Sequence, residues 1–290
     1  MSKGTEPFFD KVTILGVGLI GASFALGMKK YKFCNHLIGH GRKIENLQRA
    51  KDIGIIDSFE PDPAKACSGS DLVLFATPVG SFTEITEKIR LSFKKGTLVT
   101  DVGSVKGRLV YDMEALMPEG TYFVGGHPIA GSSRSGIDTA TAEIFRGAKC
   151  ILTPTEKTNV NAVERLTHIW KTFGCMVELI DPDEHDRIYA MVSHLPHLLA
   201  YAIVNTVADV DSSYLKFAGQ GFMGTTRIAL SSPELWRDIC ILNQDNLLKF
   251  IEIFKKNLGR LSQYLRASDL KSLEGEFERA RTLREGIGQN

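Results

Sequence analysis

The stretch Val12-Thr-Ile-Leu-Gly16-Val-Gly18-Leu-Ile-Gly21 decides the fold of this chain of 290 residues. Its apolar first half predicts a strand, and residues 22–30 predict the helix that follows. In such a unit, Gly16 permits a tight turn, Gly18 admits the pyrophosphate of a dinucleotide, and Gly21 lets the helix pack closely on the strand. The glycines could serve the turn alone, but the strand before them and the helix after them favour a dinucleotide site at the helix N-terminus.

Alternating strands and helices continue from this unit and predict a doubly wound, mostly parallel α/β sheet of the Rossmann type. Residues 71–77 are almost continuously apolar, which is typical of a strand buried on both faces. Further strands are expected at residues 36–39, 98–101, 122–125, 149–153 and 176–180, and a helix at 45–54. No convincing strand follows Asp181-Pro182. We therefore expect an NAD(P)-binding Rossmann domain at 1–181 and an all-helical substrate-binding and dimerisation domain at 182–290.

Three sequence signals shape the expected helical domain. Asp183 is expected to cap a helix that runs to about Val207, with a kink at Pro196. Ser231 and Glu234 match the capping box of a later helix. Apolar residues then recur at helical spacing, at Leu247, Ile251, Phe254, Leu258, Leu261 and Leu265. Such a stripe either fills an intrachain core or pairs two subunits, and periodicity does not separate the two.

The composition is that of a globular protein, with 43% apolar and 24% charged residues. The formal net charge of +1 gives no electrostatic reason to bind nucleic acid or an anionic membrane. The five cysteines are scattered without a CxxC pair, so neither a disulfide framework nor a zinc site is expected. The apolar run 12–28 is too interrupted by glycine to span a bilayer or to act as a leader. We expect a cytoplasmic enzyme without a metal.

The end of the second predicted strand bears on the choice of cofactor. An acidic residue there binds the ribose 2′-hydroxyl of NAD, but Gly41 stands at that position, twenty residues after Gly21. Arg42 follows and can pair with the 2′-phosphate of NADP, so the sequence favours NADP, with NAD as the alternative. Arg42 and Lys43 could instead be solvated loop charges. The residues expected to contact the cofactor are Gly16, Gly18, Leu19, Ile20, Gly21, Gly41, Arg42, Thr77, Pro78 and Ser104.

Three polar segments are expected at the carboxyl ends of the strands, where ligands bind in a doubly wound sheet. They are Thr77-Pro78, Ser104 and His127, and each directly follows a predicted strand. An imidazole with a pKa near neutrality suits a base that takes a proton from an alcohol during hydride transfer, so His127 is the expected base. Ser104 is expected to orient that imidazole and to fix its tautomer.

The helical domain contributes candidate substrate ligands. His194 and His197 are three positions apart and share one face of the predicted helix, where we expect hydrogen bonds to a polar substrate. A metal would need a further ligand that the sequence does not suggest. The plainer alternative is a buried histidine whose hydrogen bonds are all made within the protein, above all for His194.

Arg227 lies in a predicted loop, where it either binds a carboxylate through two parallel hydrogen bonds or is a surface arginine. Trp236 covers the pocket or belongs to a helix core. The remaining histidines, expected to be ordinary, are His36, His40, His168 and His185.

These motifs together resemble the prephenate and arogenate dehydrogenase family of tyrosine biosynthesis. The resemblance covers residues 12–275 and rests on GVGLIGAS (16–23), DVGSVKG (101–107), GGHPIAGS (125–132), SHLPH (193–197), GQGF (219–222) and TTRIA (225–229). It implies a Rossmann domain, a helical domain and a homodimer. It also implies oxidative decarboxylation of prephenate to 4-hydroxyphenylpyruvate and carbon dioxide, or of arogenate to tyrosine.

The resemblance assigns roles to individual residues. His127 accepts the proton of the ring C4 hydroxyl while hydride leaves C4 for the nicotinamide, and carbon dioxide departs from C1. Ser104 orients His127 and the nicotinamide. His194, His197 and Ser132 hold the substrate, and Arg227 binds a substrate carboxylate. Tyrosine, if it inhibits, is expected to compete at the active site itself.

The sequence departs from the family pattern at two places. Gly224 stands where many relatives carry an acidic residue, so the orientation of Arg227 is expected to differ. Ser133 stands where many relatives carry Glu, and Arg134 adds a cation, which favours prephenate over arogenate because the side chain of arogenate bears an ammonium group.

Two other functions stay open. A β-hydroxy-acid dehydrogenase would use a lysine on the helical domain, yet none lies between Asp183 and Val210. A non-enzymatic dinucleotide sensor would have no reason to keep a base, its serine partner and an anion clamp together.

Overall fold

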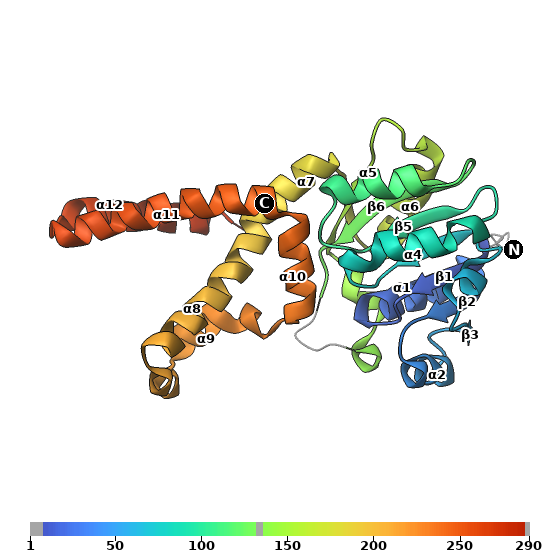
Figure 1. Cartoon of the computed structure of the whole chain (residues 1–290), viewed down its shortest axis with the longest axis horizontal. Helices are drawn as coiled ribbons and strands as arrows, with labels where there is room; N and C mark the ends of the chain where they lie inside the picture. The colour runs from blue at the N-terminus through green and yellow to red at the C-terminus, as the bar shows by residue number, and fades with distance from the viewer. Residues whose placement is uncertain (1–7, 132–135, 288–290) are drawn as a thin grey trace, which may run out of the picture.

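The computed structural model describes residues 8–131 and 136–287, which form one sheet with helices on both faces and two projecting helical arms (Figure 1). The strands are β1 (Phe9–Leu15), β2 (Cys34–His40), β3 (Ser58–Phe59), β4 (Leu72–Phe75), β5 (Leu98–Asp101), β6 (Tyr122–Pro128), β7 (Lys149–Thr153) and β8 (Met176–Leu179). The helices are α1 (Leu19–Lys30), α2 (Ile44–Asp52), α3 (Pro63–Cys67), α4 (Phe82–Ile89), α5 (Gly107–Leu116), α6 (Val160–Thr172), α7 (Pro182–Tyr189), α8 (Leu195–Asp211), α9 (Gln220–Thr226), α10 (Pro233–Leu242), α11 (Gln244–Arg266) and α12 (Leu270–Glu285).

The sheet has the order β3-β2-β1-β4-β5-β6-β7-β8, and the predicted Rossmann-type α/β class is confirmed. All neighbouring strands are parallel except β6 and β7, which are antiparallel. The strand β3 was not predicted, because two residues carry no periodicity. The strand β6 continues through Pro128, three residues past its predicted end, and His127 pairs with Ile151 of β7. The expectation that His127 follows the strand is therefore wrong, because this residue lies inside it.

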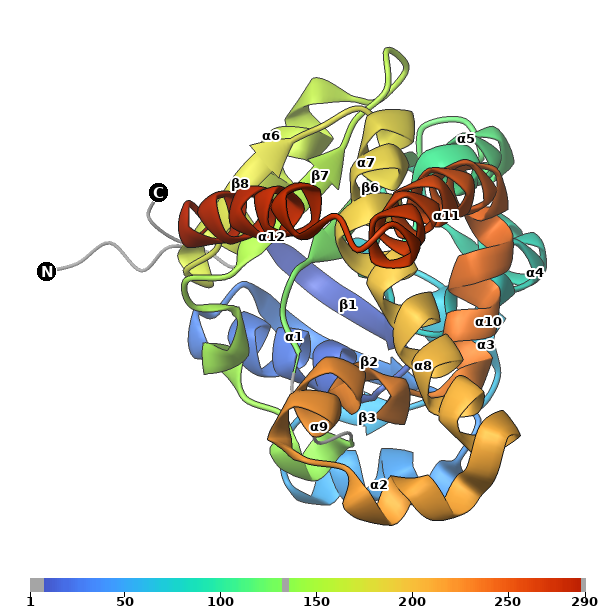
Figure 2. The same ribbon diagram turned by 90° about the vertical axis from the view of Figure 1, so that its left-hand side faces the viewer.

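The sheet is buried between two apolar layers, and Figure 2 shows the helices on either side of it. One layer contains Phe24 of α1 and Trp170 of α6, whose rings meet edge to face at 5.3 Å. The other layer contains Phe82 of α4 and residues of α5. Trp236 and Ile239 of α10 also belong to this second layer, so the helical region packs directly on the sheet region.

The glycine turn between β1 and α1 has the close contacts that its sequence predicts. Gly16 has φ +99°, and a Cβ added there would lie 2.5 Å from the carbonyl oxygen of Ala76. A Cβ at Gly21 would lie 2.2 Å from the carbonyl oxygen of Gly16. At Gly18 an added Cβ would have no described atom within 4 Å. The first and third glycines are therefore required by packing, whereas the second faces open space.

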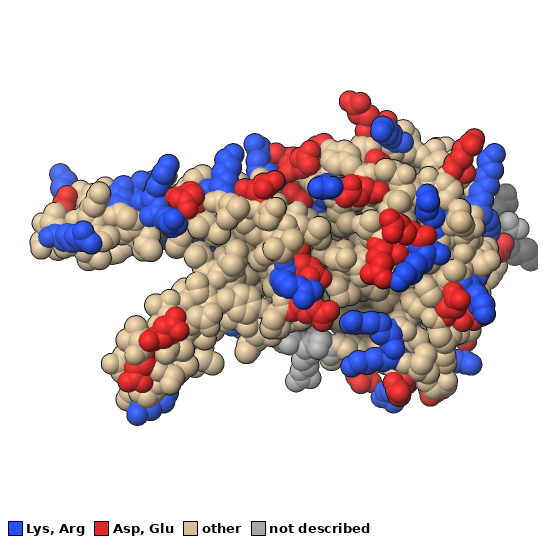
Figure 3. All heavy atoms as spheres, in the orientation of Figure 1, with Lys and Arg blue, Asp and Glu red and all other residues tan. Residues whose placement is uncertain are grey.

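The two helical arms consist of α8 with α9 and of α11 with α12 (Figure 1). At the root of α11, Leu247 and Phe250 are buried in a small core with Ala190 and Leu195. Toward the tip, Leu258 and Leu265 are 55% and 64% exposed. The apolar stripe thus fills an intrachain core in its first part and is exposed in its second. On the face shown in Figure 3, the surface between the arms is largely free of charged residues. None of the described helices is long and apolar enough to cross a membrane.

The helix starts in this region differ from those expected. Asp181 caps α7, because its Oδ1 accepts hydrogen bonds from the backbone N–H groups of Asp183 and Glu184 at 2.9 and 3.1 Å. The cap predicted at Asp183 is two residues too late. The expected long helix contains a π-helical turn, Ala190–His194, and continues without a break from α7 into α8, with Pro196 two residues after that turn.

The expected capping box at the start of α10 is wrong by one residue. Ser232, not Ser231, is the N-cap, and its Oγ accepts from the N–H of Leu235 at 3.4 Å. Pro233 follows in the first turn, where its missing N–H costs no helical hydrogen bond.

Candidate active site

A cleft of about 470 Å³ lies at the carboxyl ends of the first strands of the sheet. The residues expected to bind the cofactor that line it are Gly16, Gly18, Gly41, Arg42, Thr77 and Pro78. Lys43 and Asn46 line the side next to Arg42, and Arg237 of α10 lines the opposite side. Leu19, Ile20 and Gly21 lie in the first turn of α1 behind the cleft, and Ser104 does not line it.

The start of α1 fits the phosphates of a dinucleotide. Its N-cap is Gly18, no side chain caps the helix, and its first turn contains no acidic residue. The free N–H groups and the helix dipole therefore face the cleft with no acidic side chain in the helix's own first turn. The acidic residues of the cleft lining, Glu84, Glu234 and Asp238, come from α4 and α10. Position 41 has room for a side chain, because a Cβ there would meet only Leu47, at 3.5 Å. The absence of a carboxylate at Gly41 is therefore not imposed by packing.

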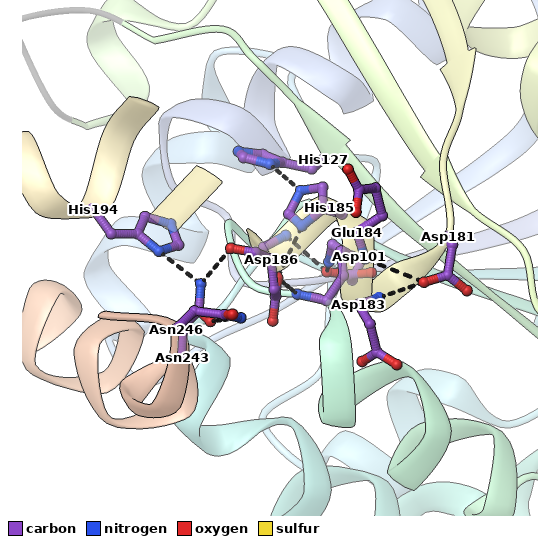
Figure 4. A network of polar contacts seen from close by, with 12 residues as sticks. Asp101, His127, Asp181, Asp183, Glu184, His185, Asp186, His194, Asn243 and Asn246 are labelled. Atoms are coloured by element: carbon purple, nitrogen blue, oxygen red, sulfur yellow. Dashed lines mark hydrogen bonds and ion pairs between the residues drawn. The ribbon is translucent and has the colours of Figure 1, made fainter. Parts of the chain in front are cut away.

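The expected base is part of a buried chain of hydrogen bonds (Figure 4). His127 is 8% exposed, and its Nδ1 lies 2.8 Å from Nε2 of His185 on α7. Nδ1 of His185 in turn lies 2.9 Å from Oδ1 of Asp186, which also accepts the backbone N–H of Lys106 at 2.7 Å. The expectation that His185 is an ordinary histidine is therefore wrong. No local signal marks it, because its partner lies 58 residues away.

A buried ion pair supports the strands beside this chain. Lys106 and Asp101 are both fully buried, and the ammonium of Lys106 contacts Oδ2 of Asp101. The same carboxylate accepts backbone N–H groups from Gly103 at 2.8 Å and from Gly126 at 3.0 Å. Asp101 thus ties the end of β5 to the residue that precedes His127. The sequence motif containing these residues was recognised, but their pairing was not.

Burial keeps the imidazoles of this region neutral. It holds the pKa of His127 well below the ordinary value, and the nearby His185, Lys106 and His194 act in the same direction. Burial likewise lowers the pKa of His185 to about 2 and that of His194 to about 4. For Asp186, burial raises the pKa to about 6, although hydrogen bonding from Lys106 opposes this. A neutral imidazole at His127 is ready to accept a proton.

The structure brings the expected substrate ligands His194 and His197 against Trp236, and Arg227 close to His197. The His197 ring stacks on Trp236 with centroids 3.5 Å apart, and the His194 ring meets it edge to face at 5.9 Å. Arg227 is close enough to lower the pKa of His197, after the larger effect of burial. It begins a helical turn (Arg227–Leu230) directly after α9, so the expectation of a loop is wrong. Trp236 combines its two alternatives, because it packs in the core and contacts both histidines.

Hydrogen bonds fix which ring nitrogens of these histidines are protonated. Nδ1 of His197 lies 2.9 Å from the carbonyl oxygen of Ser193, so Nδ1 donates and Nε2 is the acceptor. Nδ2 of Asn243 donates to the carbonyl of Asp186 and lies 3.1 Å from Nδ1 of His194. Nδ1 of His194 therefore accepts, and its Nε2 carries the proton. Asn243 joins α11 to the hydrogen-bond chain and was not predicted.

Two expected site residues have other outcomes. Ser104 does not meet Nδ1 of His127, which is bonded to His185 instead. Its backbone lies near His194, whose protonated form it favours. Ser132 lies outside the described residues, as do Ser133 and Arg134. Within residues 8–131 and 136–287, no group of three His, Cys, Asp or Glu side chains is arranged to hold a metal ion.

Comparison with known proteins agrees with this geometry. Residues 24–179 match the family model of the prephenate dehydrogenase nucleotide-binding domain, and residues 181–279 match that of the prephenate dehydrogenase dimerization domain. The chain is 34% identical to a prephenate dehydrogenase of Bacillus subtilis over 96% of this chain and 76% of that protein.

Two solved structures extend the comparison. Prephenate dehydrogenase from Aquifex aeolicus, in complex with hydroxyphenyl propionate and NAD+, has a TM-score of 0.90 and 37% identity over 96% of this chain and 98% of the other. Synechocystis arogenate dehydrogenase has a TM-score of 0.80 and 28% identity over 95% and 99%. With both family models and more than nine-tenths of its length matched, this chain is an oxidoreductase that belongs to the prephenate dehydrogenase family.

Proposed function

We propose that this enzyme oxidatively decarboxylates prephenate to 4-hydroxyphenylpyruvate and carbon dioxide, with NADP as its preferred cofactor. The observation that carries the proposal is the state of His127. Its ring is buried and neutral, and its Nδ1 is engaged by His185, so Nε2 is the nitrogen that meets a substrate. His127 lies near the carboxyl end of β6, and the dinucleotide cleft also lies at the carboxyl ends of the parallel strands.

In this mechanism Nε2 of His127 accepts the proton of the ring C4 hydroxyl. The bound nicotinamide would supply the acceptor for the hydride that leaves C4. Loss of carbon dioxide from C1 leaves its bonding electrons to complete an aromatic ring, and the C4 oxygen becomes a phenolate. His127 returns the proton to that oxygen, so the imidazole is a base and then an acid within one turnover. Ser104, in the same connection as Lys106, would orient the reacting groups.

The substrate carries two carboxylates, and we propose that the group around Trp236 holds one of them. Arg227 would bind a carboxylate through two parallel hydrogen bonds. Nε2 of His194 would donate a hydrogen bond to the substrate, Nε2 of His197 would accept one, and Ser132 would add a contact. Prephenate is preferred over arogenate because Ser133 supplies no carboxylate for the ammonium group of arogenate and Arg134 adds a cation.

NADP is proposed because Arg42 and Lys43 line the cleft after β2, where a carboxylate would bind the 2′-hydroxyl of NAD. Gly41 leaves out the carboxylate that would repel a 2′-phosphate. The Gly41→Asp variant tests this directly, because its side chain fits beside Leu47. We expect the KM for NADP to rise about 10-fold or more, and that for NAD to fall. Lys43→Gln should also raise the KM for NADP, but by less than Gly41→Asp, because it removes one of two cations and adds no negative charge.

The domain division and assembly follow the same reasoning. We propose that residues 1–181 bind the cofactor and residues 182–290 bind the substrate and pair two subunits. The exposed Leu258 and Leu265 on α11 support the pairing. Tyrosine, if it inhibits, would occupy the substrate pocket beside Trp236, since it shares the phenol ring and a carboxylate with the product.

The first test is a two-by-two measurement of reduced-cofactor absorbance, with prephenate or arogenate and NAD or NADP. We expect turnover with prephenate and NADP. Activity with NAD alone would contradict the role of Arg42, and activity with arogenate alone would contradict the substrate preference. Folded enzyme that binds cofactor but is silent in all four mixtures would refute the proposed reaction.

His127→Asn should abolish turnover with little change in substrate affinity, whereas Arg227→Ala should mainly raise KM.

A further inference from the structure

We propose that His185 and Asp186 are positioning residues for the base, which set the tautomer of His127 and compensate the charge that it gains during the reaction. This inference rests on the proposed function. It concerns residues that neither touch the substrate nor line the cofactor cleft. The chain of hydrogen bonds from His127 ends at the buried carboxylate of Asp186, which has no part in the proposed reaction (Figure 4).

The carboxylate of Asp186, at the end of the chain of hydrogen bonds, fixes which atom donates in each of them. Oδ1 of Asp186 accepts the N–H of Lys106 at 2.7 Å, and an ionised carboxylate is only an acceptor. Nδ1 of His185 must therefore donate to it, which leaves Nε2 of His185 as an acceptor. Nδ1 of His127 must then donate to that nitrogen, which leaves Nε2 of His127 without a proton. One carboxylate thus selects the tautomer in which the base is competent.

The charges around His127 explain why this carboxylate matters during turnover. The charged groups around it are Lys106, in the connection from β5 to α5, Asp101 at the end of β5, which pairs with Lys106, and Asp186 on α7, which His185 links to it. Titratable neutral groups also face it, namely His185, Tyr189 and His194. The ammonium of Lys106 is balanced by Asp101, so Asp186 supplies the unbalanced negative charge. Protonation of His127 creates a cation that this charge stabilises inside a poorly polarisable interior.

The proton transfer balances along the chain. The O–H bond of the substrate hydroxyl breaks and an N–H bond forms at Nε2 of His127, whose ring becomes an imidazolium. Its Nδ1 proton can shift toward His185 while the Nδ1 proton of His185 shifts toward Asp186, which spreads the positive charge over three groups. The shifts reverse when His127 returns the proton to the phenolate oxygen. No oxidant or reductant takes part in these steps.

The variant that removes the charge is Asp186→Asn. An amide oxygen in place of Oδ1 still accepts from Lys106 and His185 while the negative charge is lost. The amide N–H groups in place of the other oxygen cannot accept from the backbone N–H of Gly107, so one hydrogen bond is lost as well. We expect kcat for prephenate to fall about 100-fold with less than a threefold change in KM, a loss in the range of general base catalysis. The limb of the kcat profile that falls toward acid pH should disappear or move, because it reports protonation of Asp186. Asp183→Asn, an exposed neighbour on the same helix, is the matched control and should leave both unchanged.

The second readout needs no substrate. Nitrogen-15 NMR of labelled histidine in the free enzyme should show His127 and His185 protonated at Nδ1, and Asp186→Asn should mix the tautomers of both. His185→Gln, which can bridge His127 to Asp186 but cannot take up a proton, should retain more activity than His185→Leu. If Asp186→Asn does not fold, the His185 pair decides the question alone.

The outcomes separate the two proposals. A wild-type enzyme that is inactive on prephenate and arogenate overturns the proposed reaction. An active wild type with Asp186→Asn within threefold of its kcat and with unchanged tautomers overturns the positioning role and leaves the reaction intact. Equal losses in His185→Gln and His185→Leu would likewise contradict a hydrogen-bonded chain.

Discussion

Replacement of Lys106 by methionine tests whether the buried ion pair stabilises the fold. Lys106 and Asp101 are both fully buried, so Lys106→Met leaves a carboxylate without its cation in the interior. Breaking a buried pair by removing one partner costs about 3–5 kcal/mol. Asp101 keeps its hydrogen bonds from Gly103 and Gly126, which are 2.8 and 3.0 Å long, so we expect a value near the lower end, about 3 kcal/mol.

The assay is urea unfolding followed by the fluorescence of Trp170 and Trp236, at pH 8 and at pH 5. Burial raises the pKa of Asp101, and loss of Lys106 removes the charge that opposes this rise. A carboxyl group with a raised pKa in the folded state holds a proton that the unfolded chain releases. The stabilisation from this proton uptake is fully present below the pKa of the carboxyl group in the unfolded chain, and it is lost as the pH rises through the pKa of the same group in the folded chain. The loss of stability relative to the wild type should therefore be smaller at pH 5 than at pH 8.

The double variant Asp101→Asn/Lys106→Met is the control, because it removes both charges of the pair. It should recover about 1 kcal/mol or more relative to Lys106→Met. Recovery will be incomplete, since the introduced amide presents N–H groups to one of the two glycine donors. A cost below about 1 kcal/mol for the single variant at pH 8, or no recovery in the double variant, would refute the assignment of the pair as stabilising.

Three further predictions follow from packing and protonation. Gly21→Ala should destabilise the fold by about 1–3 kcal/mol in urea unfolding, because its Cβ meets a carbonyl oxygen at 2.2 Å. Gly18→Ala should fold normally and lose cofactor affinity in a fluorescence titration. Equal stability of the two variants would contradict this. Burial depresses the pKa of His127, His185 and His194, so the unfolded chain binds more protons than the folded chain below about pH 6.5. The urea concentration at the unfolding midpoint of the wild type should therefore be lower at pH 5 than at pH 7, despite the opposite contribution of Asp186. The same midpoint at both pH values would contradict this. Leu258→Glu combined with Leu265→Glu should shift the mass in light scattering from dimer to monomer with unchanged circular dichroism, and a persistent dimer would exclude this surface from the interface.

The sequence predicted the parts of the fold whose signals are local. The strand, glycine turn and helix at residues 12–30 depend on neighbours in the chain, and most later strands are marked by apolar runs. Helix starts were less certain, because several residue types can cap. Asp181 and Asp183 are both acceptable N-caps, and only Asp181 is followed directly by a proline that fits the first helical turn.

The candidate site was predictable in its residues but not in its partnerships. His127 and Arg227 stand in recognisable motifs, whereas His185 and Asp186 follow a plain capping sequence. What distinguishes them is contact across the fold, with His127 from β6 and with the backbone of Lys106. The end of β6 was misplaced for the same reason, since its last residues are strand only because β7 lies beside them.

The π-helical turn Ala190–His194 determines how one long helix serves two neighbours. Such a turn holds an extra residue relative to an α-helix, and each residue corresponds to a rotation of roughly 100°. Deleting one residue there would rotate α7 against α8, so His185 could not face His127 while His197 faces Trp236. The insertion therefore sets the rotation between α7, which packs on α5 and meets His127 through His185, and α8, whose His197 stacks on Trp236. Shortening this helix by a single residue should break either the hydrogen bond between His185 and His127 or the stacking of His197 on Trp236.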